Sequence, residues 1–520
     1  MSNDSEMNAL SVKAAVSLTD TPVLHAELAA GGGSALVGYM QGGAGAVART
    51  VQDKLRDVVS VKDFGAVGNG QADDTSAINA ADSAATALGA TLFFPTGIYC
   101  VNNSGVMQHG CSWVGAGSAS SVIKALPQSF TNNTGMVNAV GLSNFRISNL
   151  GFDISAGIFP AGIGNPGNIY WVYQAFKCTN WILDHCAFTG IQAHTIGLAV
   201  DGGSYFNIED NYFYMPVPTS AYNQAINISV AAGSVGSHFI TRNTMIGTGL
   251  FSNGGLGCID GNYVAGYAFG AGLAFGPLAN CTQNRITNNV CTGGIGEDVN
   301  NTYPSGIECW SAYSIITGNM CSANSGNGIT VGDLNTVVSN NICFNNGQSA
   351  GALGAGIKMF SIPGYNASDC VVNGNICFDN QSSKTQSYGY VEAVVGGDGI
   401  MGNTIVDNNF NNNMVGTMLA NGGKMTFRGP QLFVATGANP GTMLAGASLA
   451  AVYSIGGAEF GDTVKVSFAS DNQGISIFGY VNAINSVTVL FVNNTGGNKV
   501  FTENVLNIWI EKPVGYAGVG

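Results

Sequence analysis

Glu308 and Trp310 stand two residues apart in the segment GIECW, which begins at Gly306. Residues two apart in a β-strand point to the same side, so an exposed strand would place this carboxyl group beside an indole ring. A flat aromatic ring can stack on a sugar ring, and a carboxyl group can exchange the proton that glycoside hydrolysis requires. The pair therefore predicts a site for a polysaccharide.

Hydrolysis by two carboxyl groups requires them roughly 5 Å apart for retention or about 6.5 to 9.5 Å apart for inversion. Asp333 ends the next repeat along the chain, and Asp298 lies in the insertion TGGIGEDVNNTYP, which we expect to overhang Glu308. We predict Glu308 as the acid, Asp333 or Asp298 as the base acting through water, and Trp310 as the platform. The alternative is that these carboxylates are ordinary solvated surface.

Glu209 and Asp260 form a second-choice pair. Each comes two residues before a turn asparagine, and they are two repeats apart, hence roughly 10 Å by strand spacing. No aromatic residue accompanies them in register. Asp73 and Asp74 precede an expected helix, so we interpret them as capping residues. The histidines lack the spacing of metal ligands, so we predict structural roles for them, no metal and no cofactor; they are His109, His185, His194 and His238.

The register that turns Glu308 outward comes from seven segments in which Gly or Ala precedes an apolar residue. Alternation along a strand then predicts two outward columns. The first is Ala199, Asn227, Phe251, Ala274, Glu308, Thr330 and Lys358; the second is Asp201, Ser229, Asn253, Gly276, Trp310, Gly332 and Phe360. From these columns we predict five substrate-binding residues, namely Trp310, Lys358, Phe360, Asn227 and Thr330.

A lyase would need a base and a cation that neutralises a uronate carboxylate. Lys358 could serve as the base, but basic residues near the predicted groove are sparse, the others being Arg285 and Arg242. The sequence therefore favours hydrolysis, and elimination stays open through Lys358.

A short unit recurs between about residues 144 and 409: apolar, any, apolar, two small or polar residues, Asn, any, apolar. It reads FNIEDNYF at Phe206, CIDGNYVA at Cys258 and SIITGNMC at Ser314, at irregular intervals. Asparagine tolerates the left-handed backbone of a bend, and its amide can bond to the coil above. The 3.6-residue period of helical solenoids is absent. The pattern predicts an all-β fold, a parallel β-helix.

The body begins with VSVKDFGAVGNGQADDTSAINAADSAATALGATLFFPTGIYCV, residues 59–101. A short strand, a Gly turn and a helix with apolar residues at helical spacing lead to a further strand at 91–94. This segment resembles the pectate-lyase-like superfamily of β-helices, and with the preceding ARTVQDKLRD it resembles phage tailspikes, closely over residues 38–101. The resemblance implies a right-handed parallel β-helix and a homotrimer whose shaft binds or cleaves capsule, O-antigen or exopolysaccharide.

Three regions follow from these patterns. Residues 1–58 are weakly patterned, and we expect them to attach the protein to a virion tail or baseplate protein. Residues 59–428 form the predicted β-helix. In residues 429–520 apolar residues alternate cleanly, as in Val464, Val466 and Phe468. This alternation predicts antiparallel strands in a sandwich-like domain that caps the helix, locks the trimer or binds carbohydrate.

Composition narrows the function classes. The 520 residues carry a formal charge of −13 with only 17 Lys and Arg, which argues against a nucleic-acid partner. No apolar run of membrane-spanning length occurs, and the start MSNDSEMNALSVK lacks a signal-peptide pattern, so we expect no membrane insertion and synthesis in the host cytoplasm. Only 9% of residues are charged, so the surface is rich in Asn, Ser, Thr and Gly and suits hydroxyl-rich ligands.

Twelve cysteines occur without a CxxC pair. Four of them each follow an asparagine by two places, and we interpret them as a buried ladder of free thiols: Cys291, Cys321, Cys343 and Cys377. The leading functional hypothesis is an endo-acting polysaccharide depolymerase of a virion tail. The rivals are a receptor-binding fibre without catalysis, a polysaccharide lyase, and a secreted bacterial pectin-type enzyme, which the missing signal peptide disfavours.

Overall fold

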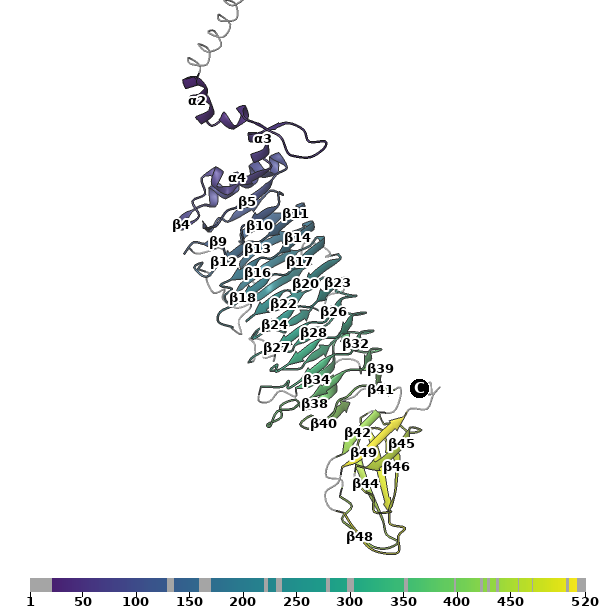
Figure 1. Cartoon of the computed structure of the whole chain (residues 1–520). Coiled ribbons are helices and arrows are strands. Elements are labelled where there is room, and N and C mark those ends of the chain that lie inside the picture. The colour runs from purple at the N-terminus through teal and green to yellow at the C-terminus, as the bar shows by residue number, and fades with distance from the viewer. Residues whose placement is uncertain are drawn as a thin grey trace, which may run out of the picture.

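The computed structural model describes residues 21–128, 135–158, 170–218, 223–230, 236–276, 281–296, 304–349, 354–396, 399–420, 424–427, 431–435, 439–456, 458–469, 471–501 and 505–511. Most of them wind into a right-handed parallel β-helix (Figure 1). Each full coil contributes one strand to each of three long parallel sheets. Sheets 1, 2 and 3 follow one another in this order along the chain, as β10, β11 and β12 do. The predicted β-helix is confirmed.

Sheet 1 has thirteen strands, including the short β35, which pairs with β34. They are β7 (Val106–Gln108), β10 (Gly135–Val140), β13 (Tyr170–Phe176), β16 (Thr195–Asp201), β19 (Gln224–Ser229), β22 (Leu250–Ser252), β25 (Leu273–Phe275), β28 (Ile307–Cys309), β31 (Ile329–Val331), β34 (Ala355–Ile362), β35 (Tyr365–Asn366), β38 (Tyr388–Val394) and β40 (Gly416–Ala420).

Sheet 2 has fourteen strands. They are β3 (Val58–Ser60), β5 (Thr91–Phe94), β8 (Trp113–Gly115), β11 (Ser143–Ser148), β14 (Thr179–Asp184), β17 (Ser204–Glu209), β20 (His238–Thr241), β23 (Gly257–Asp260), β26 (Arg285–Thr287), β29 (Ile315–Thr317), β32 (Val337–Ser339), β36 (Val371–Asn373), β39 (Met401–Val406) and β41 (Lys424–Phe427).

Sheet 3 has twelve strands. They are β4 (Asn69–Asp73), β6 (Gly97–Val101), β9 (Ser121–Ala125), β12 (Gly151–Asp153), β15 (Ala187–Thr189), β18 (Tyr212–Tyr214), β21 (Thr244–Ile246), β24 (Tyr263–Ala265), β27 (Val290–Thr292), β30 (Met320–Ser322), β33 (Ile342–Phe344) and β37 (Ile376–Phe378).

The recurring asparagine forms a ladder at the bend from sheet 2 to sheet 3. From the second ladder residue onward, each Oδ1 atom accepts from the main-chain N–H and from the side-chain amide of the ladder residue one coil earlier, as Asn341 does from Asn319 at 2.9 Å in both bonds. The ladder runs through Asn211, Asn243, Asn262, Asn289, Asn319, Asn341, Asn375 and Asn408. The left-handed backbone belongs to the preceding residue, such as Gly318 (φ 69°), and not to the ladder residue itself. The predicted ladder is therefore confirmed, and the predicted left-handed position was wrong by one residue.

Stacked side chains fill the core between the sheets. Cys291, Cys321, Cys343 and Cys377 are direct neighbours on successive strands of sheet 3, and all four are buried. This confirms the predicted thiol ladder. An aromatic stack lies under sheet 2, where the ring of His238 packs 5.1 Å from that of Phe206. Burial lowers the pKa of His238 to about 4, which keeps the imidazole neutral in this stack.

The N-terminal part holds four short elements and a capping helix. The short elements are α2 (Thr21–Ala29), η1 (Gly33–Leu36), α3 (Val51–Leu55) and η2 (Val61–Phe64), with a two-strand pair of β1 (Gly38–Tyr39) and β2 (Arg49–Thr50). Helix α4 (Thr75–Leu88) covers the first coils and buries Ile78, Ala81 and Ala85. Asp73 accepts from the Thr75 N–H at the start of α4, but Asp74 instead accepts from the N–H groups of residues 67 and 68. Only Asp73 therefore caps the helix as predicted.

Antiparallel strands follow the β-helix at its C-terminal end (Figure 1). The predicted boundary at residue 429 lies outside the described residues, between β41 and β42. One sheet contains β42 (Gln431–Ala435), β49 (Leu506–Glu511) and β45 (Thr463–Phe468), and the other contains β44 (Ser448–Ser454), β47 (Ser486–Val492) and β46 (Ser476–Ala483). A small pair joins β43 (Thr442–Met443) to β48 (Lys499–Val500). The sheets face each other so closely that a Cβ on Gly479 would meet Val464 at 2.4 Å, which is sandwich packing.

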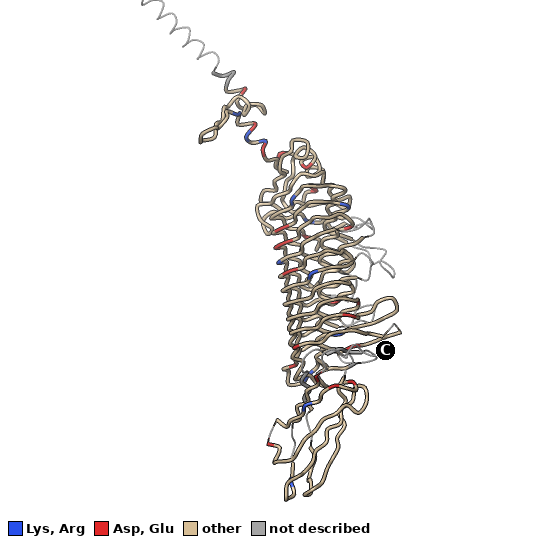
Figure 2. Tube along the Cα trace, turned by 90° about the vertical axis from the view of Figure 1, so that its right-hand side faces the viewer, with Lys and Arg blue, Asp and Glu red and all other residues tan. Residues whose placement is uncertain are grey.

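None of the helices among the described residues is both long and apolar enough to cross a membrane. Charged residues are sparse along the coils (Figure 2). The outer surface of the coils combines uncharged polar groups with exposed apolar side chains, such as Phe239, Tyr263 and Ile342, and has few charged clusters.

Candidate functional site

The outward face of sheet 1 carries the residues that the sequence singles out. Glu308 on β28 pairs in register with Ala274 below and Thr330 above, and Thr330 pairs with Lys358. Asn227 lies in the same column, three strands earlier. Ile307 and Cys309 are buried, whereas Glu308 is half-buried. The predicted register is confirmed.

Trp310 lies flat against the next coil. A Cβ on Gly332 would come within 2.0 Å of the Trp310 ring, so only a glycine leaves room for the indole. Phe360 and Tyr365 flank the same ring edge-on, with centroid distances of 5.8 Å and 6.0 Å. This aromatic cluster holds the indole in one orientation with part of its surface exposed.

Tyr365 was missed from the sequence. It comes from the short hairpin in which β35 folds back on β34, pairing with Ile362. The repeat pattern describes one strand of sheet 1 per coil and gives no sign of a second, antiparallel strand. The only signal was the turn sequence SIPGY.

Lys358 lies on β34 with Phe360, two strands after Glu308 in the same column. Its Nζ atom sits 4.2 Å from the centroid of the Phe360 ring, a cation–π arrangement. Burial lowers the pKa of Lys358, and the attraction of Glu308 opposes that shift. The opposite charges of this pair favour the charged form of both side chains. Thr330 lies between Glu308 and Lys358 in the column. It is buried, and its hydroxyl oxygen accepts from the Asn327 side-chain amide at 3.1 Å.

Asp333 lies where the chain leaves sheet 1 for sheet 2. Burial raises the pKa of its carboxyl group, partly offset by a 2.8 Å hydrogen bond from the Leu334 N–H. The Asp333 carbonyl accepts from the Cys370 thiol at 3.5 Å in the same bend. A raised pKa keeps this carboxyl group protonated to a higher pH than an ordinary aspartate, which suits a proton donor. Asp298, the other predicted partner of Glu308, lies outside the described residues.

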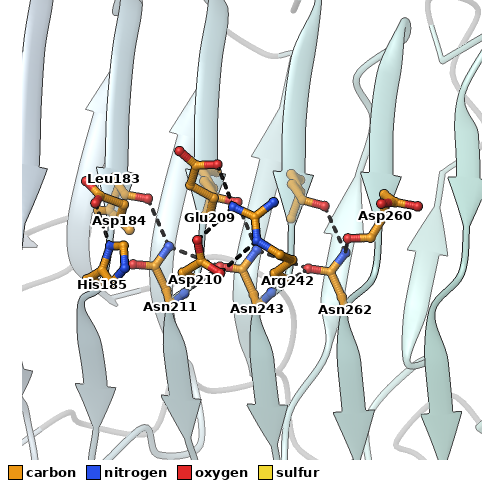
Figure 3. A network of polar contacts seen from close by, with 12 residues as sticks. Leu183, Asp184, His185, Glu209, Asp210, Asn211, Arg242, Asn243, Asp260 and Asn262 are labelled. Atoms are coloured by element: carbon orange, nitrogen blue, oxygen red, sulfur yellow. Dashed lines mark hydrogen bonds and ion pairs between the residues drawn. The ribbon is translucent and has the colours of Figure 1, made fainter.

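The second-choice pair lies on sheet 2, at the bend to sheet 3 (Figure 3). Glu209 and Asp260 flank Thr241 in one column, as predicted. Arg242 donates to Glu209 at 2.9 Å and to both oxygens of Asp210 at 2.8 Å and 2.7 Å. The Asp260 carboxylate accepts from Thr287 and, at 2.9 Å, from Asn288. These bonds give both carboxylates structural partners.

The expectation that Arg242 and Arg285 lie near the groove of Glu308 was wrong. Arg242 lies at the bend after β20, and Arg285 begins β26, so both belong to sheet 2 and not to the predicted groove. Of the three basic residues considered for a lyase, Lys358 alone faces outward on sheet 1. Within the described residues, no three His, Cys, Asp or Glu side chains gather as they would around a metal ion.

Comparisons with known proteins agree with this fold. Residues 58–304 match the family model of rhamnogalacturonase A/epimerase, pectate lyase-like. A segment is 44% identical over 105 residues to mannuronan C5-epimerase AlgE1 of Azotobacter vinelandii, covering 18% of this chain and 8% of that protein. Another is 53% identical over 49 residues to the tail spike protein of an Escherichia phage, covering 9% of this chain and 6% of that protein. The chain thus spans less than a tenth of either relative.

Two solved tailspike structures resemble the fold of most of the chain. The Dettilon tailspike protein (gp208) has a TM-score of 0.56 at 14% identity, with 89% of this chain and 96% of that chain covered. A tailspike protein of E. coli bacteriophage HK620, solved in complex with a pentasaccharide, has a TM-score of 0.55 at 13% identity, with 94% and 99% covered. Residues 58–304 are therefore similar to the pectate-lyase-like family, and the described parts of the chain have the fold of these two tailspike proteins.

Proposed function

We propose that this chain is a phage tailspike that binds and depolymerises a host surface polysaccharide on the outward face of sheet 1. The observation that carries the proposal is the cluster of Glu308, Lys358 and Trp310, in which a carboxylate, an ammonium group and a partly exposed indole lie within three successive coils of one face. The tailspike fold and the saccharide complex of the HK620 protein support it.

For the chemistry we propose endo-glycosidic hydrolysis with Asp333 as the acid and Glu308 as the base. This reverses the roles predicted from the sequence. Burial raises the pKa of Asp333, which suits a proton donor, whereas the neighbouring Lys358 favours an ionised Glu308. Glu308 pairs with Thr330 on the next coil, and Asp333 lies three residues beyond Thr330. Strand rise and coil spacing then put the two Cα atoms roughly 11 Å apart, which suits the wider separation of an inverting pair with a water between the carboxyl groups.

The test is incubation of the pure protein with the surface polysaccharide of a susceptible host strain. Hydrolysis releases reducing ends, whereas elimination also creates an unsaturated product that absorbs ultraviolet light. Glu308→Gln and Asp333→Asn should each lower turnover by about 10² to 10⁴ while binding survives. Glu209→Gln, the matched control on sheet 2, should retain activity.

Three outcomes would contradict parts of this proposal. Loss of activity in Glu209→Gln with full activity in Glu308→Gln would move the site to sheet 2. An unsaturated product that disappears in Lys358→Met would replace hydrolysis by elimination. Tight binding by the wild-type protein without any cleavage would leave a receptor-binding fibre as the function.

A further inference from the structure

The outward face of sheet 3 carries no charge over most of its length. In each of its three-residue strands the first and third residues point outward, while the second, such as Cys343 on β33, is buried in the core. In the eight described strands from β15 to β37, none of the outward positions holds Asp, Glu, Lys, Arg or His. They are Ala187, Thr189, Tyr212, Tyr214, Thr244, Ile246, Tyr263, Ala265, Val290, Thr292, Met320, Ser322, Ile342, Phe344, Ile376 and Phe378.

The first residues of these strands form one continuous column. Each pairs directly with the next, from Ala187 on β15 to Ile376 on β37. In the neighbouring column, the rings of Phe344 and Phe378 stack with their centroids 5.4 Å apart. Five large side chains of the first column are 37% to 42% exposed, namely Tyr212, Tyr263, Met320, Ile342 and Ile376.

The area of this face is close to what a protein interface needs. At roughly 80 Å² each, the five large side chains of the column expose about 400 Å² in one line. The half-buried side chains of the same strands, such as Tyr214 and Ile246, raise the total to roughly 700 Å². A stable interface takes about 800 Å² from each partner. Sheet 3 therefore offers enough surface, most of it apolar, for a stable contact with another protein.

The lack of charge indicates that the partner is a second copy of this chain. In a cyclic oligomer of parallel rods, rotation about the axis puts each residue at the same height as its own copy. A charged side chain on the shared face would then meet a like charge, whereas an apolar side chain meets an apolar one. The other two faces do not meet this condition, since sheet 1 carries Glu308 and sheet 2 carries Glu209 and Arg285.

We propose that the face of sheet 3 from β18 to β37 is the contact between subunits, covered by the same face of further copies of this chain that lie parallel to it. The contact spans six strand spacings, about 29 Å along the axis. It lies on a different sheet from Glu308 and does not depend on the proposed function.

The first experiment uses the full chain and measures its mass by light scattering. Ile342→Lys combined with Ile376→Lys places like charges from every copy on the shared face, so it should lower the association constant at least roughly 10²-fold and yield folded monomers. The matched control combines Tyr205→Lys with Tyr313→Lys. These tyrosines are 68% and 57% exposed at the bend from sheet 1 to sheet 2, and their replacement should leave the mass unchanged.

The second experiment tests the parallel arrangement with one introduced cysteine. Ile342→Cys should be cross-linked to its own copy by a short bis-maleimide, because the two lie at the same height, and Tyr313→Cys should not. The wild-type protein is the blank, since its own thiols are buried or half-buried.

Three outcomes would overturn the proposed contact. They are a wild-type protein that is a stable monomer, a double lysine variant that keeps the mass of the oligomer, and an oligomer in which Ile342→Cys is not cross-linked. Circular dichroism checks the fold of each variant, and if the double lysine variant does not fold, the cross-linking of Ile342→Cys decides. Absence of polysaccharide cleavage by the intact oligomer would count against the proposed function and leave the contact standing.

Discussion

Replacing Asn319 with leucine tests whether the asparagine ladder stabilises the shaft. Asn319 is 1% exposed, and its Nδ2 atom donates to the Ile286 carbonyl at 2.9 Å and to the Asn341 Oδ1 atom at 2.9 Å. Its Oδ1 atom accepts from the Asn289 N–H at 2.9 Å. Leucine has the same branched arrangement of side-chain heavy atoms, so Asn319→Leu removes these bonds without leaving a cavity.

The substitution deprives two buried main-chain groups of their partners, the Ile286 carbonyl and the Asn289 N–H. Each unsatisfied group costs about 1 to 3 kcal/mol, so we expect about 4 kcal/mol for the pair. In hydrogen exchange, this corresponds to a roughly thousandfold loss of protection for the amides of β26, β29 and β32.

The control is Asn207→Leu, the same change on the outward, half-exposed face of sheet 2. We expect it to leave exchange close to that of the wild-type protein. If Asn319→Leu lost no more protection than this control, the ladder would be a geometric regularity without a stabilising role.

Three further predictions concern other parts of the molecule. The stacked thiols around Cys321 should react with thiol reagents only after unfolding, because burial raises the pKa of this thiol and excludes the reagent; rapid labelling of the native protein would refute the buried ladder. Asp184 is buried, which opposes its ionisation, but hydrogen bonds from Arg146 and His185 outweigh burial and lower the pKa of its carboxyl group. A native pKa below the ordinary value near 4 stabilises the folded protein at higher pH, and this stabilisation is lost as the pH falls through the native pKa. Arg146→Gln should therefore raise the pH at which the protein unfolds in acid. An unchanged midpoint of acid unfolding would contradict this account. Finally, we expect a homotrimer that resists detergent and heat, and light scattering that gave a stable monomer would refute it.

The sequence predicted the face of Glu308 because strand alternation has a strict period of two. Once Ile307 and Cys309 are assigned to the core, Glu308 and Trp310 can only point outward. The same reasoning found the thiol ladder, since each cysteine follows a ladder asparagine by the same interval. These predictions depended on local periodicity alone.

Features that depend on contacts between coils could not be predicted. Tyr365 packs edge-on against Trp310 only because β35 folds back on β34, and the repeat of one strand per coil gives no sign of this pairing. The ion pairs that hold Glu209 depend on Arg242, which lies 33 residues further along the chain. The raised pKa of Asp333 reflects burial by several coils, which one repeat of sequence does not encode.

Because each coil carries one ladder asparagine, the β-helix can lengthen or shorten only by whole coils. Successive ladder residues lie 30 residues apart from Asn289 to Asn319 but 22 apart from Asn319 to Asn341, yet their side-chain bonds measure 3.0 Å and 2.9 Å. A coil can therefore vary in its loops without disturbing its neighbours. Deleting residues 319–340 would join Gly318 to Asn341 and restore the same left-handed residue followed by a ladder asparagine. Insertion or loss of whole coils would therefore lengthen or shorten the β-helix by about 4.8 Å per coil while the fold of the other coils stays the same.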